Sequence, residues 1–163
     1  MKLYHIFLIS IAFVMFSCSD DDDQASEVQV QSLVFGSFTG ECFGDCFDVF
    51  KIDGTKLEED RIVDFYTQNY SFKGSFTFPG EEFMKHQSIL NEIPAELIEG
   101  SDKTFGCPDC ADQGGVYLVI TIGDGKTINY LIDTDDTEDQ STEITTFKKK
   151  IFEIIIELTG ALN

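Results

Sequence analysis

The chain has little positive charge and few groups suited to catalysis. Its 163 residues include no tryptophan, 2 histidines, and 11 lysines and arginines against 30 aspartates and glutamates. A formal net charge of −19 at pH 7 argues against nucleic acid as a partner, because phosphates require basic groups. His86 is the only histidine beyond residue 5, so a Ser-His-Asp centre has one available base, and we expect that base on an exposed surface. The composition favours a non-enzymatic protein over an enzyme.

A long hydrophobic run is also missing. The longest covers residues 3–16, whereas a membrane-spanning helix needs roughly 20 apolar residues. The run follows Met1-Lys2 and precedes Ser17-Cys18, a pattern typical of a secretory signal peptide at residues 1–17. Cleavage there leaves Cys18 at the N-terminus, where its thiol can carry lipid. We therefore expect a lipidated cysteine and acidic tether at residues 18–28, and a single domain at residues 29–163.

The residues around Cys18 resemble a bacterial lipoprotein signal, in which a small residue such as Ser17 precedes the modified cysteine. The acidic stretch that follows is similar to the export signal of Bacteroidota lipoproteins, formed here by Ser19, Asp20, Asp21, Asp22 and Asp23. The segment GCPDCADQGG at residues 106–115 resembles part of small lipoproteins from the same group. These resemblances imply a lipid anchor on Cys18, an outer-membrane location and a domain facing the cell surface. They imply no activity.

Four cysteines form the most chemically suggestive set: Cys42, Cys46, Cys107 and Cys110. Disulfides are the expected state in an exported domain. Four thiols allow three pairings, of which we favour pairing within each motif. Cysteines with two or three residues between them also have normal zinc-ligand spacing, and exposed Cys-x-x-Cys motifs occur in redox proteins. A zinc or thiol–disulfide role is therefore the first alternative function.

The acidic stretch at residues 133–139 has the composition of a calcium loop, with Asp133, Asp135, Asp136 and Asp139 as candidate ligands. Its register departs from an EF-hand loop, since Glu138 stands at the turn-glycine position and Ile144 at the bidentate-acid position. We favour a solvated loop leading into a helix. A calcium-binding, adhesin-like element is the second alternative. We expect no cofactor, with zinc and calcium as the exceptions to test.

Hydrophobic periodicity predicts an α+β fold: a largely antiparallel sheet of about five strands with two to three helices packed on one face. Strands are expected at residues 28–39, 47–52, 55–61, 116–122 and 127–132, with Asp53-Gly54 and Asp124-Gly125 as hairpin turns. Helices are expected at residues 81–91, in a short turn at 94–99, and at 142–159. The buried stripe of the last helix is formed by Ile144, Phe147, Ile151, Ile155 and Leu158.

The anchor, the acidity and the missing catalytic centre together predict a lipid-anchored envelope lipoprotein. We expect it to act as a non-enzymatic binding or accessory module for an unidentified protein or ligand. Most of the 16 phenylalanines and 5 tyrosines are expected in the core. An exposed aromatic face around residues 72–78 would support the binding role.

Overall fold

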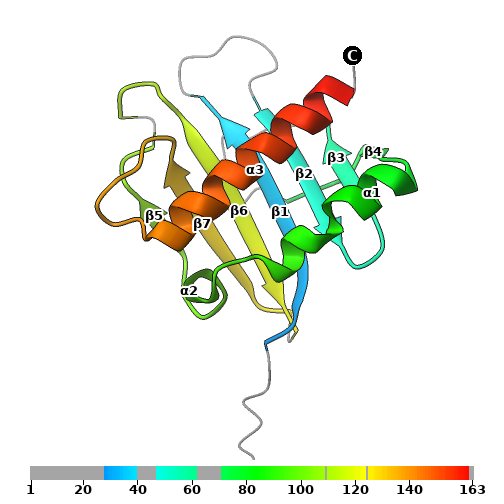
Figure 1. Cartoon of the computed structure of the whole chain (residues 1–163), viewed down its shortest axis with the longest axis horizontal. Helices are drawn as coiled ribbons and strands as arrows, with labels where there is room; N and C mark the ends of the chain where they lie inside the picture. Colours follow the sequence, from blue (N-terminus) through cyan, green and yellow to red (C-terminus); the bar gives the residue numbers. More distant parts are fainter. Residues whose placement is uncertain (1–27, 40–46, 62–70, 109, 124, 162–163) are drawn as a thin grey trace, which may run out of the picture.

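The computed structural model describes residues 28–39, 47–61, 71–108, 110–123 and 125–161. Seven strands form one sheet in the order β4-β3-β2-β1-β6-β7-β5. They are β1 (Val30–Phe38), β2 (Phe47–Asp53), β3 (Leu57–Asp60), β4 (Phe76–Thr77), β5 (Lys103–Phe105), β6 (Gly115–Ile122) and β7 (Thr127–Asp133). The helices are α1 (Gly80–His86), the 3₁₀ helix η1 (Gln87–Asn91), α2 (Ala95–Ile98) and α3 (Thr142–Ala161). They lie on one face of the sheet, and α3 crosses it diagonally (Figure 1).

The α+β layers confirm the sequence prediction and the five expected strands are present, but the described residues form seven strands instead of about five. The two additional strands, β4 and β5, are two and three residues long. β5 pairs in parallel with β7, whereas every other pair is antiparallel. Strands this short show no alternation that a sequence pattern reveals, so they were missed.

The main core lies between the sheet and its helices. All five residues of the predicted α3 stripe are buried, and they pack against sheet residues such as Leu33 and Leu118. The aromatic rings of Phe35, Phe50 and Phe78 continue this core, with ring centroids 5.6 and 6.0 Å apart in successive pairs. Burial of this apolar face, at about 25 cal/mol per Å², is the main stabilising contribution.

The opposite face of the sheet carries a smaller cluster around Val34, Val49 and Tyr117. Gly36 lies directly across from Tyr117 in the β1–β6 register. A Cβ atom on Gly36 would stand 2.4 Å from the carbonyl oxygen of Asp48, so glycine is required for the close approach of β1 and β2. Phe72 packs against this second cluster from the segment that precedes β4.

The aromatic residues at positions 72–78 do not form the exposed face that would have supported the binding role. Phe78 is buried, Phe76 meets it edge-on with ring centroids 5.1 Å apart, and Phe72 is half-buried. Among the described residues, the exposed large hydrophobic side chains are Val28, Met84 and Ile156, and none of them is aromatic. No helix in the described part of the chain has the length and apolar character needed to span a membrane.

Candidate functional site

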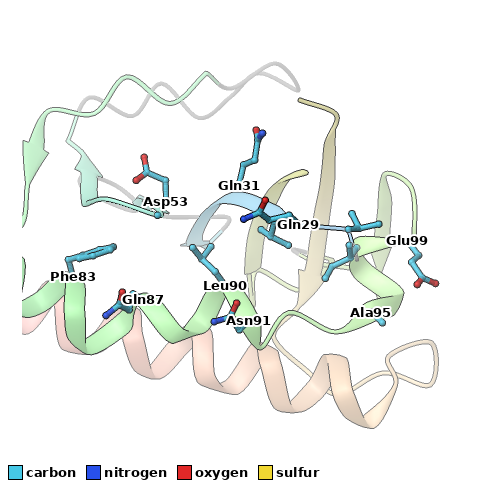
Figure 2. A pocket seen from close by; sticks show the side chains of 13 residues that line it. Gln29, Gln31, Asp53, Phe83, Gln87, Leu90, Asn91, Ala95 and Glu99 are labelled. Atoms are coloured by element: carbon cyan, nitrogen blue, oxygen red, sulfur yellow. The ribbon is translucent and has the colours of Figure 1, made fainter. Parts of the chain in front are cut away.

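A groove of about 1270 Å³ opens between the start of β1 and the helical segment that follows β4 (Figure 2). The first residues of β1 form one wall, and α1, η1 and α2 form the other. The β2–β3 turn closes one end at Asp53 and Gly54, and α2 lies at the other end with Glu99 just beyond it (Figure 2). Sequence reasoning missed this groove, because its lining residues come from four separate parts of the chain.

The helical wall of the groove is fixed to the rest of the fold by polar contacts. The hydroxyl of Tyr130 in β7 donates a buried hydrogen bond of 3.0 Å to the carbonyl oxygen of Leu97 in α2. Two ion pairs connect the wall to α3, joining Lys85 of α1 to Glu157 at 2.8 Å, and Glu92, between η1 and α2, to Lys150. The groove is therefore part of the built structure of the domain.

The groove combines a partly buried apolar floor with neutral polar side chains. Leu90, Phe83 and Ile98 are half-buried, and four exposed amides surround them: Gln29, Gln31, Gln87 and Asn91. The lining contains no lysine, arginine, histidine, serine or cysteine among the described residues. Amide side chains recognise hydrogen-bonding groups without being nucleophiles or proton carriers at neutral pH. This chemistry is suited to binding.

Asp53 is held in place by the turn that it starts. Its Oδ1 atom accepts hydrogen bonds from the Thr55 amide at 2.8 Å, the Thr55 hydroxyl at 2.7 Å and the Lys56 amide at 3.1 Å. Burial acts to raise the pKa of Asp53, but these hydrogen bonds and the charge of Lys51 outweigh it and lower the pKa. The groove therefore keeps a fixed negative charge at this end.

One backbone edge of β1 is open inside the groove. The pairing of β1 with β2 ends at Ser32 opposite Asp53, whereas its pairing with β6 continues to Val30 opposite Ile122, with an irregularity at Gln31. On the β2 side, Val30 and Gln31 have no strand partner in the described ranges. Both residues line the groove.

The structure tests only part of the cysteine prediction. Cys107 and Cys110 form a disulfide with a Cα–Cα distance of 5.5 Å, which confirms pairing within this motif. Cys42 and Cys46 lie outside the described residues, as do Cys18 and the export-signal residues from Ser19 to Asp23.

The surroundings of this disulfide do not favour redox chemistry. The loop is held by carboxylates, since the Cys107 amide donates to Asp133 Oδ2 at 2.9 Å and the Gly106 amide donates to the Asp139 carboxylate at 3.0 and 3.1 Å. A turn leads from Cys110 to strand β6, and no helix starts in the described residues between them. Neighbouring negative charge and the lack of a helix N-terminus both disfavour a thiolate.

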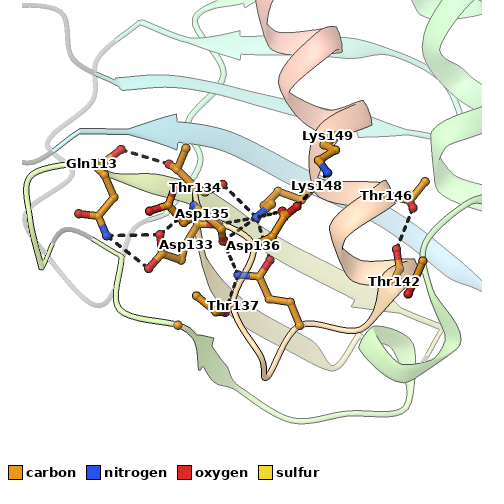
Figure 3. A network of polar contacts seen from close by, with 12 residues as sticks. Gln113, Asp133, Thr134, Asp135, Asp136, Thr137, Thr142, Thr146, Lys148 and Lys149 are labelled. Carbon is orange, nitrogen blue, oxygen red and sulfur yellow. Dashed lines mark hydrogen bonds and ion pairs between the residues drawn. The ribbon is translucent and has the colours of Figure 1, made fainter.

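Three of the four acidic residues proposed as calcium ligands have side chains that bind different groups of the protein, and Figure 3 shows two of them, Asp133 and Asp136. Asp133 accepts hydrogen bonds from the Asp135 amide at 3.0 Å and from Gln113 Nε2 at 3.3 Å, and Asp136 pairs with Lys149 at 2.9 Å. Asp139 binds the Gly106 amide and the Thr137 hydroxyl. Within the described ranges, no three or more histidine, cysteine, aspartate or glutamate side chains are placed to hold a metal ion. The structure therefore does not support a calcium site formed by Asp133, Asp135, Asp136 and Asp139.

The ammonium group of Lys148 occupies the interior of this acidic loop (Figure 3). Lys148 is 1% exposed. Its Nζ atom donates to the carbonyl oxygens of Asp133, Thr134 and Asp135 at 2.9, 3.0 and 2.9 Å. Gln140 Oε1 lies 2.8 Å away and Asp136 Oδ1 3.0 Å away. The loop does gather oxygen atoms around a cation, but the cation belongs to the protein itself.

A sequence signal for this contact exists. Lys148 lies four residues after Ile144 and three before Ile151, on the buried stripe of α3. A lysine at such a position needs oxygen partners, because an unpaired buried charge is costly. The acidic loop immediately before the helix supplies them.

His86 is buried rather than exposed, which corrects the sequence expectation. Its residue exposure is 5%, and its Nε2 atom lies 3.6 Å from carboxylate oxygens of both Glu82 in α1 and Glu157 in α3. Burial, together with the charge of Lys85, lowers the pKa of His86 and outweighs the attraction of Glu157 and Glu82. Nε2 makes no hydrogen bond within the described structure.

The lowered pKa predicts a pH effect on stability. The unfolded chain binds the His86 proton near the ordinary pKa of 6.5, whereas the folded chain resists protonation. The free energy of unfolding should therefore fall as the pH drops below 6.5, until the lower folded pKa is passed. The free energy of unfolding, measured by urea denaturation at several pH values in this interval, should change less with pH for His86→Gln than for the wild type. Equal changes with pH would mean that His86 does not contribute to this pH dependence.

Comparison with known proteins adds no information on function. No protein family, curated protein or solved structure matches the chain. The function is therefore inferred from the sequence and from the geometry of the groove.

Proposed function

We propose that the chain is a lipid-anchored envelope lipoprotein that acts as a non-enzymatic binding module, with the groove beside β1 as its ligand site. The groove is the observation that supports this proposal. Its lining offers amides, apolar side chains and two carboxylates, and no described lining residue forms a nucleophile–base pair. Such a surface is suited to binding a ligand and lacks the groups needed to catalyse a reaction of that ligand.

The position of the groove is consistent with an anchored role. Val28, the first described residue, is part of the groove lining, and the proposed tether from Cys18 leads directly to it. A ten-residue tether spans at most roughly 35 Å when extended. A ligand in the groove would thus be held close to the membrane surface, on a chain whose formal net charge of −19 does not attract anionic lipid headgroups.

The anchor is tested by metabolic labelling with palmitate in the native host. The wild-type protein should carry the label and sediment with the outer membrane, whereas Cys18→Ala should lose both properties. The proposal includes an anchor on this residue, so an unlabelled wild-type protein beginning at Met1 would contradict it.

The binding role is tested by filling the groove. Ala95 is exposed at the start of α2 and lines the groove, so Ala95→Tyr should obstruct it without disturbing the core. The protein purified from its envelope under native conditions should release a bound component that Ala95→Tyr loses. Met84→Tyr is the matched control, because Met84 is 63% exposed on α1 and outside the groove. Retention of the same component by Ala95→Tyr would exclude the groove as the ligand site.

A further inference from the structure

Resting on the proposed function, we infer that the ligand of the groove is an extended, positively charged polypeptide segment that pairs with the backbone of β1 at Val30 and Gln31. The segment would lie along β1, between this strand and the helical wall formed by η1 and α2. Three independent features of the groove define this ligand class.

The first feature is the open strand edge. Val30 and Gln31 continue β1 beyond the last β1–β2 pair, so their β2 side faces the groove without a strand partner among the described residues. An unpaired edge offers backbone N–H and C=O groups to an incoming extended chain, and such strand addition is a common mode of peptide recognition. The outer strands of the sheet, β4 and β5, also have unpaired edges among the described residues, but they are only two and three residues long and do not line the groove.

The second feature is charge. Asp53 and Glu99 lie at opposite ends of the groove (Figure 2), and none of the described residues that line it is basic. The hydrogen-bonded turn keeps Asp53 ionised, and the net charge of −19 steers cationic molecules towards the domain. A peptide with lysine or arginine near each end satisfies both carboxylates. The chain's own tether does not fit, because Asp20 to Asp23 carry the same sign of charge as the groove.

The third feature is the size and polarity of the groove. Its volume of about 1270 Å³ exceeds the roughly 300–1,000 Å³ typical of small-molecule pockets. The side chains of Gln29 and Asn91 both lie in the groove (Figure 2), and no hydrogen bond joins either side-chain amide to another described residue. A side-chain amide has the donor and acceptor needed to bind a peptide backbone of any sequence. Leu90 and Phe83 provide apolar contacts for side chains on one side of the strand.

Three synthetic peptides test the inference in titration calorimetry with the full lipoprotein in neutral detergent. They are an eight-residue peptide of alternating lysine and valine, a peptide of the same length with glutamate in place of lysine, and the lysine–valine peptide with its two central valines replaced by proline. The lysine–valine peptide should bind, and the glutamate peptide should not. Because any cation is attracted to this acidic chain, the proline peptide of equal charge is the decisive comparison. It should bind at least about tenfold more weakly, since proline removes the donors needed for strand pairing.

Variants of the protein locate the binding. Glu99→Gln should weaken the lysine–valine peptide about fivefold, whereas Glu143→Gln, on the exposed start of α3, should leave its affinity unchanged. Amide hydrogen exchange should slow at residues 29–31 when the peptide is bound. Equal affinity for the proline peptide, or unchanged exchange at these residues, would overturn the inference. If no peptide binds while Ala95→Tyr still removes the native component, the ligand class is wrong but the binding function stands.

Discussion

Replacing Lys148 with methionine is expected to lower the free energy of unfolding by roughly 3 kcal/mol or more. The substitution removes the ammonium that binds three backbone carbonyls and the Gln140 amide, and it leaves these acceptors facing an apolar side chain. The carbonyl oxygen of Asp133 is in a buried residue, so water cannot easily replace the lost donor. For a domain of this size, the melting temperature should fall by roughly 10 °C.

Lys149→Met is the matched control for this substitution. Lys149 is the next residue, and its Nζ atom pairs with the same Asp136 carboxylate at 2.9 Å, but its side chain is 61% exposed. An exposed ion pair contributes at most about 1 kcal/mol, so the control should unfold close to the wild-type temperature. Melting temperatures of the wild type, Lys148→Met and Lys149→Met, measured by calorimetry, show whether stability is lost because the buried ammonium is removed or because any positive charge is removed. Equal losses for both variants would show that the oxygen cage around Lys148 contributes nothing specific.

The large elements of the fold were predictable because their sequences carry a strong local period. The α3 stripe repeats at helical spacing, and Asp53-Gly54 specifies the hairpin between β2 and β3. The short strands lack such a signal. β5 exists because residues 103–105 meet β7 in a parallel pair, and this contact depends on the fold as a whole. The burial of His86 also depends on the whole fold. The polar neighbours Lys85 and Gln87 indicate a surface segment, but α3 lies against it, with Glu157 close to both Lys85 and His86.

The two candidate sites differ in how much the sequence revealed. The sequence favoured a solvated loop at residues 133–139, and it did not reveal that the backbone carbonyls of this loop surround the ammonium group of Lys148. No local sequence pattern predicts the groove. Gln29, Asp53, Asn91 and Glu99 are each unremarkable, and they form one surface only because β1 extends beyond β2 and the η1–α2 segment lies beside it. Sites assembled from several elements require the tertiary structure before they can be recognised.

Ile151→Ala is expected to lower the free energy of unfolding by about 3 kcal/mol, within the range of roughly 2–5 kcal/mol seen for buried aliphatic side chains. Ile151 is 0% exposed at the middle of α3 and belongs to the core between this helix and the sheet. Truncation removes apolar contacts and leaves a cavity that the surrounding residues fill only in part. The value can be measured from the shift in the urea midpoint at constant m.

Ile156→Ala is the control that separates the loss of core packing in Ile151→Ala from the effect of alanine on helix propensity. It deletes the same atoms five residues later in α3, but Ile156 is 68% exposed. Alanine is the better helix former, so this variant should be as stable as the wild type or more stable by a few tenths of a kcal/mol. Because both substitutions share that propensity gain, the difference between them measures the contact of α3 with the sheet. Similar stabilities for the two variants would mean that α3 does not pack through the stripe that contains Ile151.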